Sequence, residues 1–157
     1  MVGTPIPGAE ATLTAAPALN HANLTITNNL SETVHMRVEV ADTEPARELG
    51  LMFRPSVPPD EGMLFDFQGD TTSSFWMENT ILPLSIAFID KDGVIIGILD
   101  MQALDRTPLS APGPYRYALE TDQGFFRAHN IGVSDKVVKS NDTTQSVVVP
   151  GMPGCYR

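Results

Sequence analysis

The chain has 157 residues, a formal net charge of −9 and a pI of about 4.6. This length fits one compact domain, and the surplus of acidic groups disfavours binding to nucleic-acid phosphates or to anionic membranes. With 42% hydrophobic and 18% charged residues, the composition is that of a globular protein that folds by burying apolar surface. The longest apolar run, residues 93–99, is far shorter than the roughly 20 residues of a membrane span.

The two ends of the chain differ in composition from its middle. Residues 1–30 are rich in Ala, Thr, Pro and Asn, which favours an extended tether over a packed element. They contain no recognisable export signal, so a periplasmic or secreted location is expected only if a signal has been removed. The single cysteine, Cys155, cannot form an internal disulfide and indicates no compartment. We predict a tether over residues 1–30, a core domain over 31–150 and a tail over 151–157.

The core domain is predicted to begin with a strand and a short helix. Apolar and polar residues alternate over Val34–Val40, which is the period of a half-buried strand. Asp42 or Thr43 can cap a two-turn helix that has Pro45 in its first turn, and Gly50 is placed to end it.

The rest of the chain is predicted to form short strands. The clearest hairpin joins residues 85–89 and 94–99 through Asp-Lys-Asp-Gly at 90–93. A helical turn is expected near residues 122–129. Further strands are predicted at residues 62–67, 74–77, 115–120, 136–138 and 146–149. This pattern predicts a mainly β fold, a compact single-domain β-barrel or sandwich with one or two short helices.

Three ordered motifs resemble one known family. They are Glu-Leu-Gly-Leu-Met-Phe-Arg at 48–54, Gly-Met-Leu-Phe at 62–65 and Phe-Trp-Met-Glu-Asn-Thr at 75–80. With weaker matches up to residue 139, the chain from about residue 34 is similar to the domain of unknown function 192. The resemblance implies a small, mostly β domain of bacteria and archaea, often found after an export signal, with no established activity. Ser85 stands where the family usually has Asp, and Ser134 where it usually has Gly, so a site that used that carboxylate would be altered here.

The segment 75–80 is the leading candidate for a binding site. It joins large apolar side chains to a polar triplet, as in a pocket wall where rings grip a ligand and an amide orients it. Alternatively, its apolar side chains fill the core while its polar ones bond to a turn. In a strand, Trp76 points away from its two neighbours, which suits the core-filling alternative least. The candidate ligand-binding residues are Phe75, Trp76, Met77, Asn79 and Thr80.

Three charged residues are candidates for the rim of that site. Arg54 can fork onto a ligand carboxylate or, within the protein, onto Glu120 or Asp135. The two carboxylates also leave open a hydrolase that uses them as an acid and base pair, which depends on their separation.

Metal sites and known catalytic motifs are not indicated. The three histidines show no ligand spacing, the seven methionines suit packing, and the loop at 90–93 lacks the later ligands of a calcium site. We therefore predict no cofactor and no metal, and leave the question of an enzyme open while favouring none. The sequence favours a non-catalytic domain that binds a small ligand or a glycan. The alternatives are the Glu120 and Asp135 hydrolase and a protein-interaction module of an exported protein.

Overall fold

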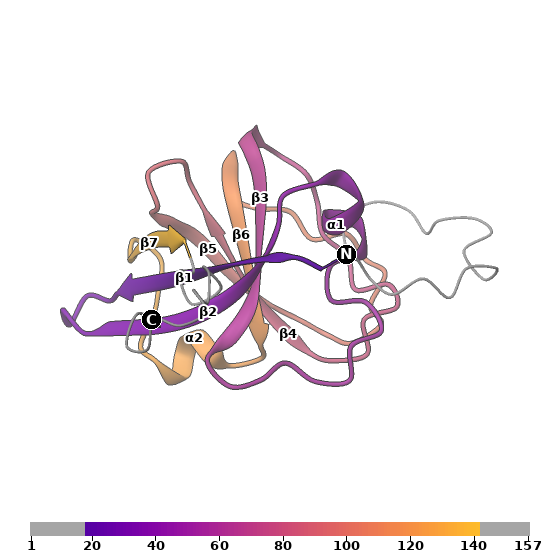
Figure 1. The fold of residues 1–157 in the computed structure, drawn as a ribbon, viewed down its shortest axis with the longest axis horizontal. Coiled ribbons are helices and arrows are strands. Elements are labelled where there is room, and N and C mark those ends of the chain that lie inside the picture. The colour runs from indigo at the N-terminus through magenta and orange to yellow at the C-terminus, as the bar shows by residue number, and fades with distance from the viewer. Residues whose placement is uncertain (1–17, 142–157) are drawn as a thin grey trace, which may run out of the picture.

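A computed structural model describes residues 18–141. The elements along the chain are β1 (Asn20–Thr27), β2 (Thr33–Ala41), α1 (Glu44–Leu49), β3 (Glu61–Thr71), β4 (Leu84–Ile89), β5 (Ile95–Met101), β6 (Tyr115–Asp122), α2 (Phe125–Ala128) and β7 (Lys136–Asn141). The strands form one sheet in the order β5-β4-β6-β3-β2-β1-β7, as Figure 1 shows. Neighbouring strands are antiparallel except β2 and β3, which are parallel. The predicted mainly β fold is confirmed.

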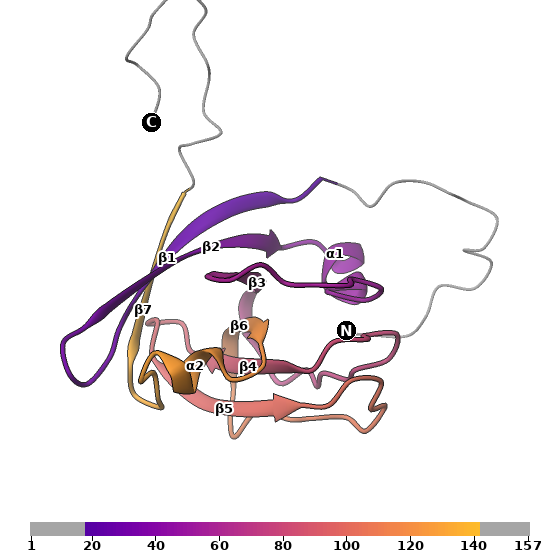
Figure 2. The ribbon, with the colours of Figure 1, turned by 90° about the horizontal axis from the view of Figure 1, so that it is seen from below.

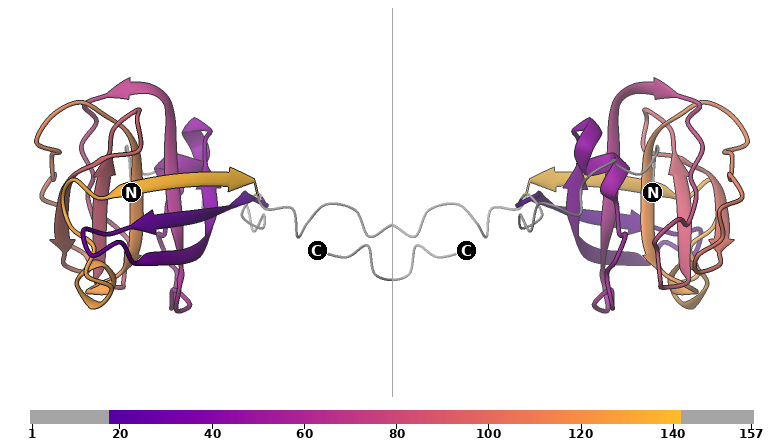
Figure 3. Two further views of the ribbon diagram at one scale, coloured as in Figure 1. Left: turned by 90° about the vertical axis from the view of Figure 1, so that its left-hand side faces the viewer. Right: turned by 90° about the vertical axis from the view of Figure 1, so that its right-hand side faces the viewer.

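The sheet curls into a half-barrel whose edges meet at one end. Val94 bridges Lys136, and the Val137 amide donates a hydrogen bond of 2.7 Å to the carbonyl of Gly93. Gly93 has a φ of 85°, and a Cβ there would lie 2.4 Å from the Val137 carbonyl, so this contact requires glycine. The curl brings the start of β7 to the turn between β4 and β5, and β7 runs beside β1 (Figures 2 and 3).

The short helix α1 has the ends that the sequence predicts. The Thr43 hydroxyl accepts a hydrogen bond of 3.3 Å from the Ala46 amide, which satisfies one of the free donors of the first turn. Pro45 lies in the first turn, where its missing N–H costs nothing, and Gly50 ends the helix with a φ of 49°. The predicted helical turn near residues 122–129 is also present, as α2.

Each face of the sheet packs its own apolar cluster. The first cluster contains Phe65, Phe75, Phe88 and Tyr115, whose rings meet mostly edge to face, with centroids 4.9 to 6.5 Å apart. The second cluster lies on the opposite face and contains Leu24, Leu64, Ile89, Leu119 and Val137. Because strand residues alternate between faces, Ala118 belongs to the first cluster and Leu119 to the second.

The structure corrects two of the predicted elements. Residues 20–27, predicted to belong to the extended lead-in, form β1, which pairs with both β2 and β7. The strand predicted at 74–77 is reduced to a single bridge between Phe75 and Leu109. The predicted strand at 146–149, residues 1–17 and Cys155 lie outside the described residues.

Within residues 18–141, no helix is long and apolar enough to cross a membrane.

Candidate functional site

The candidate segment 75–80 is divided between the core and the surface. Phe75, Met77 and Thr80 are buried, with exposed fractions of 1% or less. Trp76 and Asn79 are partly exposed. The apolar side chains of Phe75 and Met77 therefore belong to the first cluster, while Trp76 points away from it, as alternation along an extended chain requires.

Three loops meet around this segment and form what we call the three-loop surface, residues 50–54, 76–81 and 102–106. The Phe53 amide donates a hydrogen bond of 2.8 Å to the Asn79 carbonyl, and the Leu104 amide donates one of 2.9 Å to the Thr80 carbonyl. Phe53, Asn79 and Leu104 each adopt a left-handed φ, of 65°, 55° and 63°. For Phe and Leu this backbone conformation is strained. It persists because the hydrogen bonds between the loops hold the backbone in place.

A cation lies against Trp76 on this surface. The Arg106 guanidinium carbon is 5.7 Å from the centroid of the Trp76 ring, within the range of a cation–π interaction. The same guanidinium pairs with Glu78, with 3.2 Å between Nη2 and Oε1. The Arg106 side chain is 70% exposed, whereas that of Glu78 is only 12% exposed. Arg106 is thus an exposed cation held by a nearly buried carboxylate and an aromatic ring.

Two polar atoms of this site are buried without a partner in the part of the chain that the structure describes. Among the described residues, neither Trp76 Nε1 nor Glu78 Oε2 has a hydrogen-bond partner, although both atoms are buried. A buried donor or acceptor without a partner costs about 1–3 kcal/mol, so each is a place where a further group would be favourable. One unused atom is a donor and the other an acceptor. The site can therefore accept a group that both gives and takes a hydrogen bond.

Sequence reasoning missed Glu78 and Arg106. Glu78 lies two residues after Trp76, so an extended segment places both on one side, and that spacing was a usable signal. Arg106 comes from a separate loop that the hydrogen bond between the Met77 amide and the Asp105 carbonyl, 2.8 Å long, holds in place. No local pattern in the sequence predicts that approach.

Arg54 is paired within the protein, but not with either predicted partner. Its guanidinium forks onto the Glu39 carboxylate of β2, with 2.8 Å between Nη2 and Oε2. The prediction of Glu120 or Asp135 as its internal partner is wrong, because the guanidinium pairs with Glu39 and Glu120 is enclosed in the core. The hydrogen bonds from Arg54 hold the pKa of Glu39 below its usual value. Arg54 and Glu39 also line a cleft of about 250 Å³ together with Leu51.

Glu120 lies in the interior instead of at a rim. Its side chain is on the face of the first cluster, on β6 between Met63 of β3 and Ile86 of β4. It is 0% exposed, and neither carboxyl oxygen has a hydrogen-bond partner among residues 18–141. Burial raises the pKa of Glu120 to about 8, so the group is mostly protonated at neutral pH.

Asp135 is engaged in a turn and does not meet Glu120. Its Oδ2 accepts a hydrogen bond of 2.7 Å from the Gly132 amide, just before β7. The flanking residues Ile131 and Val137 pack into the second cluster, on the other face of the sheet from Glu120. The two carboxyl groups therefore do not face one substrate position, and this placement gives the hydrolase alternative no support.

The two departures from the family pattern have local explanations. The Ser85 hydroxyl donates to Asp100 Oδ1 at 2.8 Å and accepts a bond of 3.0 Å from the Gly124 amide, so a neighbouring strand supplies the carboxylate that position 85 lacks. Ser134 has a φ of 79°, a conformation that glycine adopts without strain. Within residues 18–141, no three His, Cys, Asp or Glu side chains gather in a group that could hold a metal ion.

Comparison with known proteins agrees with the motifs and the fold. Residues 25–139 match DUF192, described as an uncharacterized ACR family. The chain belongs to the DUF192 family. A protein of unknown function from Novosphingobium aromaticivorans is 33% identical with a TM-score of 0.73, over 87% of this chain and 99% of that one. A proposed transcription regulator from Sinorhizobium meliloti is 29% identical with a TM-score of 0.77, over 80% of this chain and 98% of that one. No curated protein matches this DUF192 chain.

Proposed function

We propose that this DUF192 domain is a non-catalytic binding domain that takes the cationic group of a small ligand at Trp76, Glu78 and Arg106. The observation that carries the proposal is the difference in exposure between the cation and the groups that hold it. A nearly buried carboxylate and an aromatic face hold a cation that is itself 70% exposed. Two buried polar atoms beside it, on Trp76 and Glu78, have no partner among the described residues.

The ligand would replace Arg106. An exposed cation–π contact and an exposed ion pair are each worth about 1 kcal/mol or less, so Arg106 can be displaced at small cost. A guanidinium or alkylammonium group in its place keeps both contacts and adds a donor for Glu78 Oε2. A carbonyl or hydroxyl next to that group would accept from Trp76 Nε1. These requirements describe an arginine-like or lysine-like group that carries a neighbouring acceptor.

DNA binding is not the function that we propose, although one similar structure is named as a proposed transcription regulator. DNA binding depends on clustered cations that neutralise phosphates. This chain has a net charge of −9. At the Trp76 site, the exposed Arg106 is paired with Glu78 and does not belong to a cluster of cations.

The single tryptophan allows the proposal to be tested site by site. Trp76 fluorescence is titrated with N-acetyl-arginine amide, and N-acetyl-citrulline amide serves as the uncharged control of the same shape. We expect a saturable change with the first compound only. Arg106→Ala removes the internal competitor and should strengthen binding about three- to tenfold, which corresponds to ~1 kcal/mol. Glu78→Gln should abolish the response.

Arg127→Ala is the matched control, because it removes an equally charged and 80% exposed arginine elsewhere. It should leave the titration unchanged. Equal responses to the arginine and citrulline compounds, or weaker binding by Arg106→Ala, would contradict the proposal. If neutral oligosaccharides give a saturable change and the arginine compound gives none, the ligand is a glycan and not a cation.

A further inference from the structure

A second cleft lies where the edges of the half-barrel meet. It has a volume of about 330 Å³ and is bounded by β7 on one side and by the turn between β4 and β5 on the other. Ile89, Tyr117 and Val137 contribute apolar lining. The mouth of a β-barrel is a common position for a ligand site, and this volume is at the lower end of the usual range. The cleft can hold a small molecule with an apolar body.

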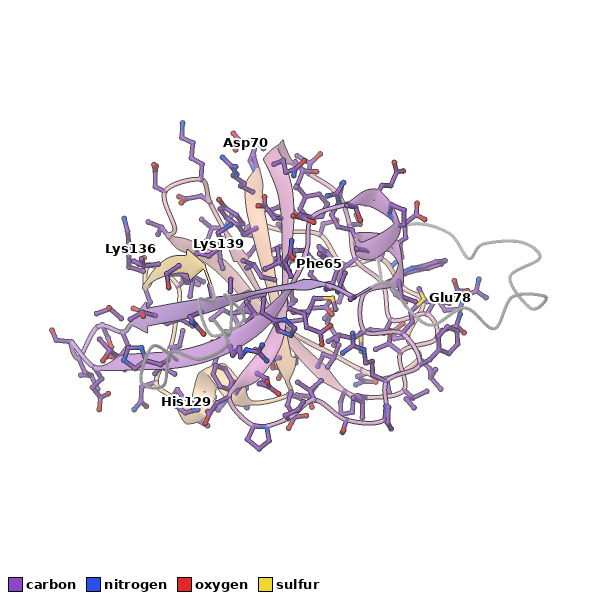
Figure 4. All side chains as sticks on the ribbon, in the orientation of Figure 1. Phe65, Asp70, Glu78, His129, Lys136 and Lys139 are labelled. Atoms are coloured by element: carbon purple, nitrogen blue, oxygen red, sulfur yellow. The ribbon has the colours of Figure 1, made fainter. Side chains whose placement is uncertain are left out.

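All the lysines of the chain line this cleft. The sequence contains three, and Lys91, Lys136 and Lys139 are all part of the lining. Lys91 comes from the turn after β4. Lys136 and Lys139, which Figure 4 labels, come from β7. The bridge between Val94 and Lys136 brings the two segments together. A chain with a net charge of −9 thus concentrates its ammonium groups at one concave place.

Two of these ammonium groups have no ion pair within the described part of the chain. Lys139 is 3.7 Å from Asp66 Oδ2 and lies 5.7 Å from the Tyr117 ring centroid. Within residues 18–141, neither Lys91 nor Lys136 has a carboxylate within ion-pair distance. Asp92 also lines the cleft, but the nearby Asp90 carboxylate is occupied by the amides of its own turn. The residues that line the cleft thus carry three ammonium groups and one carboxylate, that of Asp92.

We propose that this cleft binds a small amphiphilic anion, with its apolar body against Tyr117 and Val137 and its anionic head between Lys91 and Lys136. Because the lining is both apolar and cationic, it disfavours two other classes of ligand. A neutral lipid would form no ion pair with the ammonium groups. A compact inorganic anion would leave the apolar walls exposed to water. This site is separate from the one at Trp76, because Figure 4 places Glu78 and the two labelled lysines at opposite ends of the molecule.

The test uses decanoate as the probe, with binding followed by calorimetry. Decanol carries the same chain without the charge, and decyltrimethylammonium carries the opposite charge. We expect saturable binding of one decanoate per chain, binding of decanol at least about tenfold weaker, and no binding of the cation at this site. Because the rim is exposed to solvent, the affinity for decanoate should fall as salt is added.

Variants separate this cleft from general charge effects. Lys91→Met with Lys136→Met keeps the aliphatic stems and should weaken decanoate binding at least about tenfold. Both positions are exposed, so the fold should be kept, and an unchanged circular dichroism spectrum checks this. Arg127→Ala with Arg37→Ala removes the same charge outside the cleft and should leave decanoate binding unchanged. Equal loss in both double variants, equal binding of decanol, or no binding of decanoate would overturn the proposal.

Discussion

The two ends of the molecule present opposite chemistries on one curled sheet. At one end, Glu78 and Trp76 hold an exposed arginine. At the other, Lys91 and two lysines of β7 help to line a largely apolar cleft, and Figure 4 labels the two on β7. The first end is built on the cluster that contains Phe75, and the second on the cluster that contains Val137. The comparison teaches that the net charge of −9 describes neither end, because the three lysines line one cleft while an exposed arginine lies at the other end.

The largest expected effect concerns Glu120, which lies in the core between the two ends. Its pKa is about 8 in the folded chain and 4.5 in an ordinary setting. Between these values the unfolded chain ionises while the folded chain keeps its proton, so stability falls as pH rises from about 4.5 to about 8 and then levels off. Glu120→Met should remove this loss, on the order of 4 kcal/mol at about pH 9, measured by urea unfolding across pH.

Glu120→Met also tests the independence of the two ends. At about pH 6 the variant should bind decanoate and N-acetyl-arginine amide as the wild type does, because Glu120 lines neither site. If it shifts either affinity by more than about threefold, the core couples the two ends and they are not separate. If the pH dependence of stability is the same in the variant and the wild type, Glu120 instead has a polar partner in solution.

The next effect concerns the packing beneath the three-loop surface. Phe75 is 1% exposed and contacts Phe65 with ring centroids 5.1 Å apart, so Phe75→Ala should cost about 3–5 kcal/mol. Phe53→Ala, which truncates a 65% exposed ring of the same surface, should cost less than about 0.5 kcal/mol. Urea unfolding of both variants gives the comparison. A small loss for Phe75→Ala would mean that this ring does not belong to the packed core.

Phe75 also distinguishes local from global damage. Phe75→Leu should weaken the Trp76 response to N-acetyl-arginine amide while leaving decanoate affinity within about twofold, because only the first end is built on this ring. A parallel loss of both affinities would show that the ends share one support.

The smallest effect concerns the pair between Arg54 and Glu39, which is only partly buried. Removal of either partner should cost about 1 kcal/mol, and a double-mutant cycle with alanine at both positions should give a similar coupling free energy. The pKa of Glu39 is lowered, so this contribution is present above about pH 4.5 and is lost as pH falls through the lowered value. A coupling near zero at neutral pH would place Arg54 on another partner.

The sequence predicted more of the fold than of the site. Alternation over Val34–Val40 and the turn at 90–93 predicted β2 and the hairpin because those patterns are local. Residues 20–27 were missed, because the Asn and Thr on the partly exposed face of β1 resemble those of a tether. The pairing of Arg106 with Glu78, and the convergence of Lys91 with Lys136, depend on contacts between segments far apart in sequence. Only the closure of the sheet brings them together.

The most direct test of opposite chemistries at the two ends is a pair of amide NMR titrations on the same wild-type sample. N-acetyl-arginine amide should shift the amides of residues 76–80 and 104–106 and leave those of β7 in place. Decanoate should shift residues 91–94 and 136–139 and leave the three-loop surface in place. The account would be contradicted if both ligands shifted the same amides. It would also be contradicted if each ligand shifted the amides expected for the other.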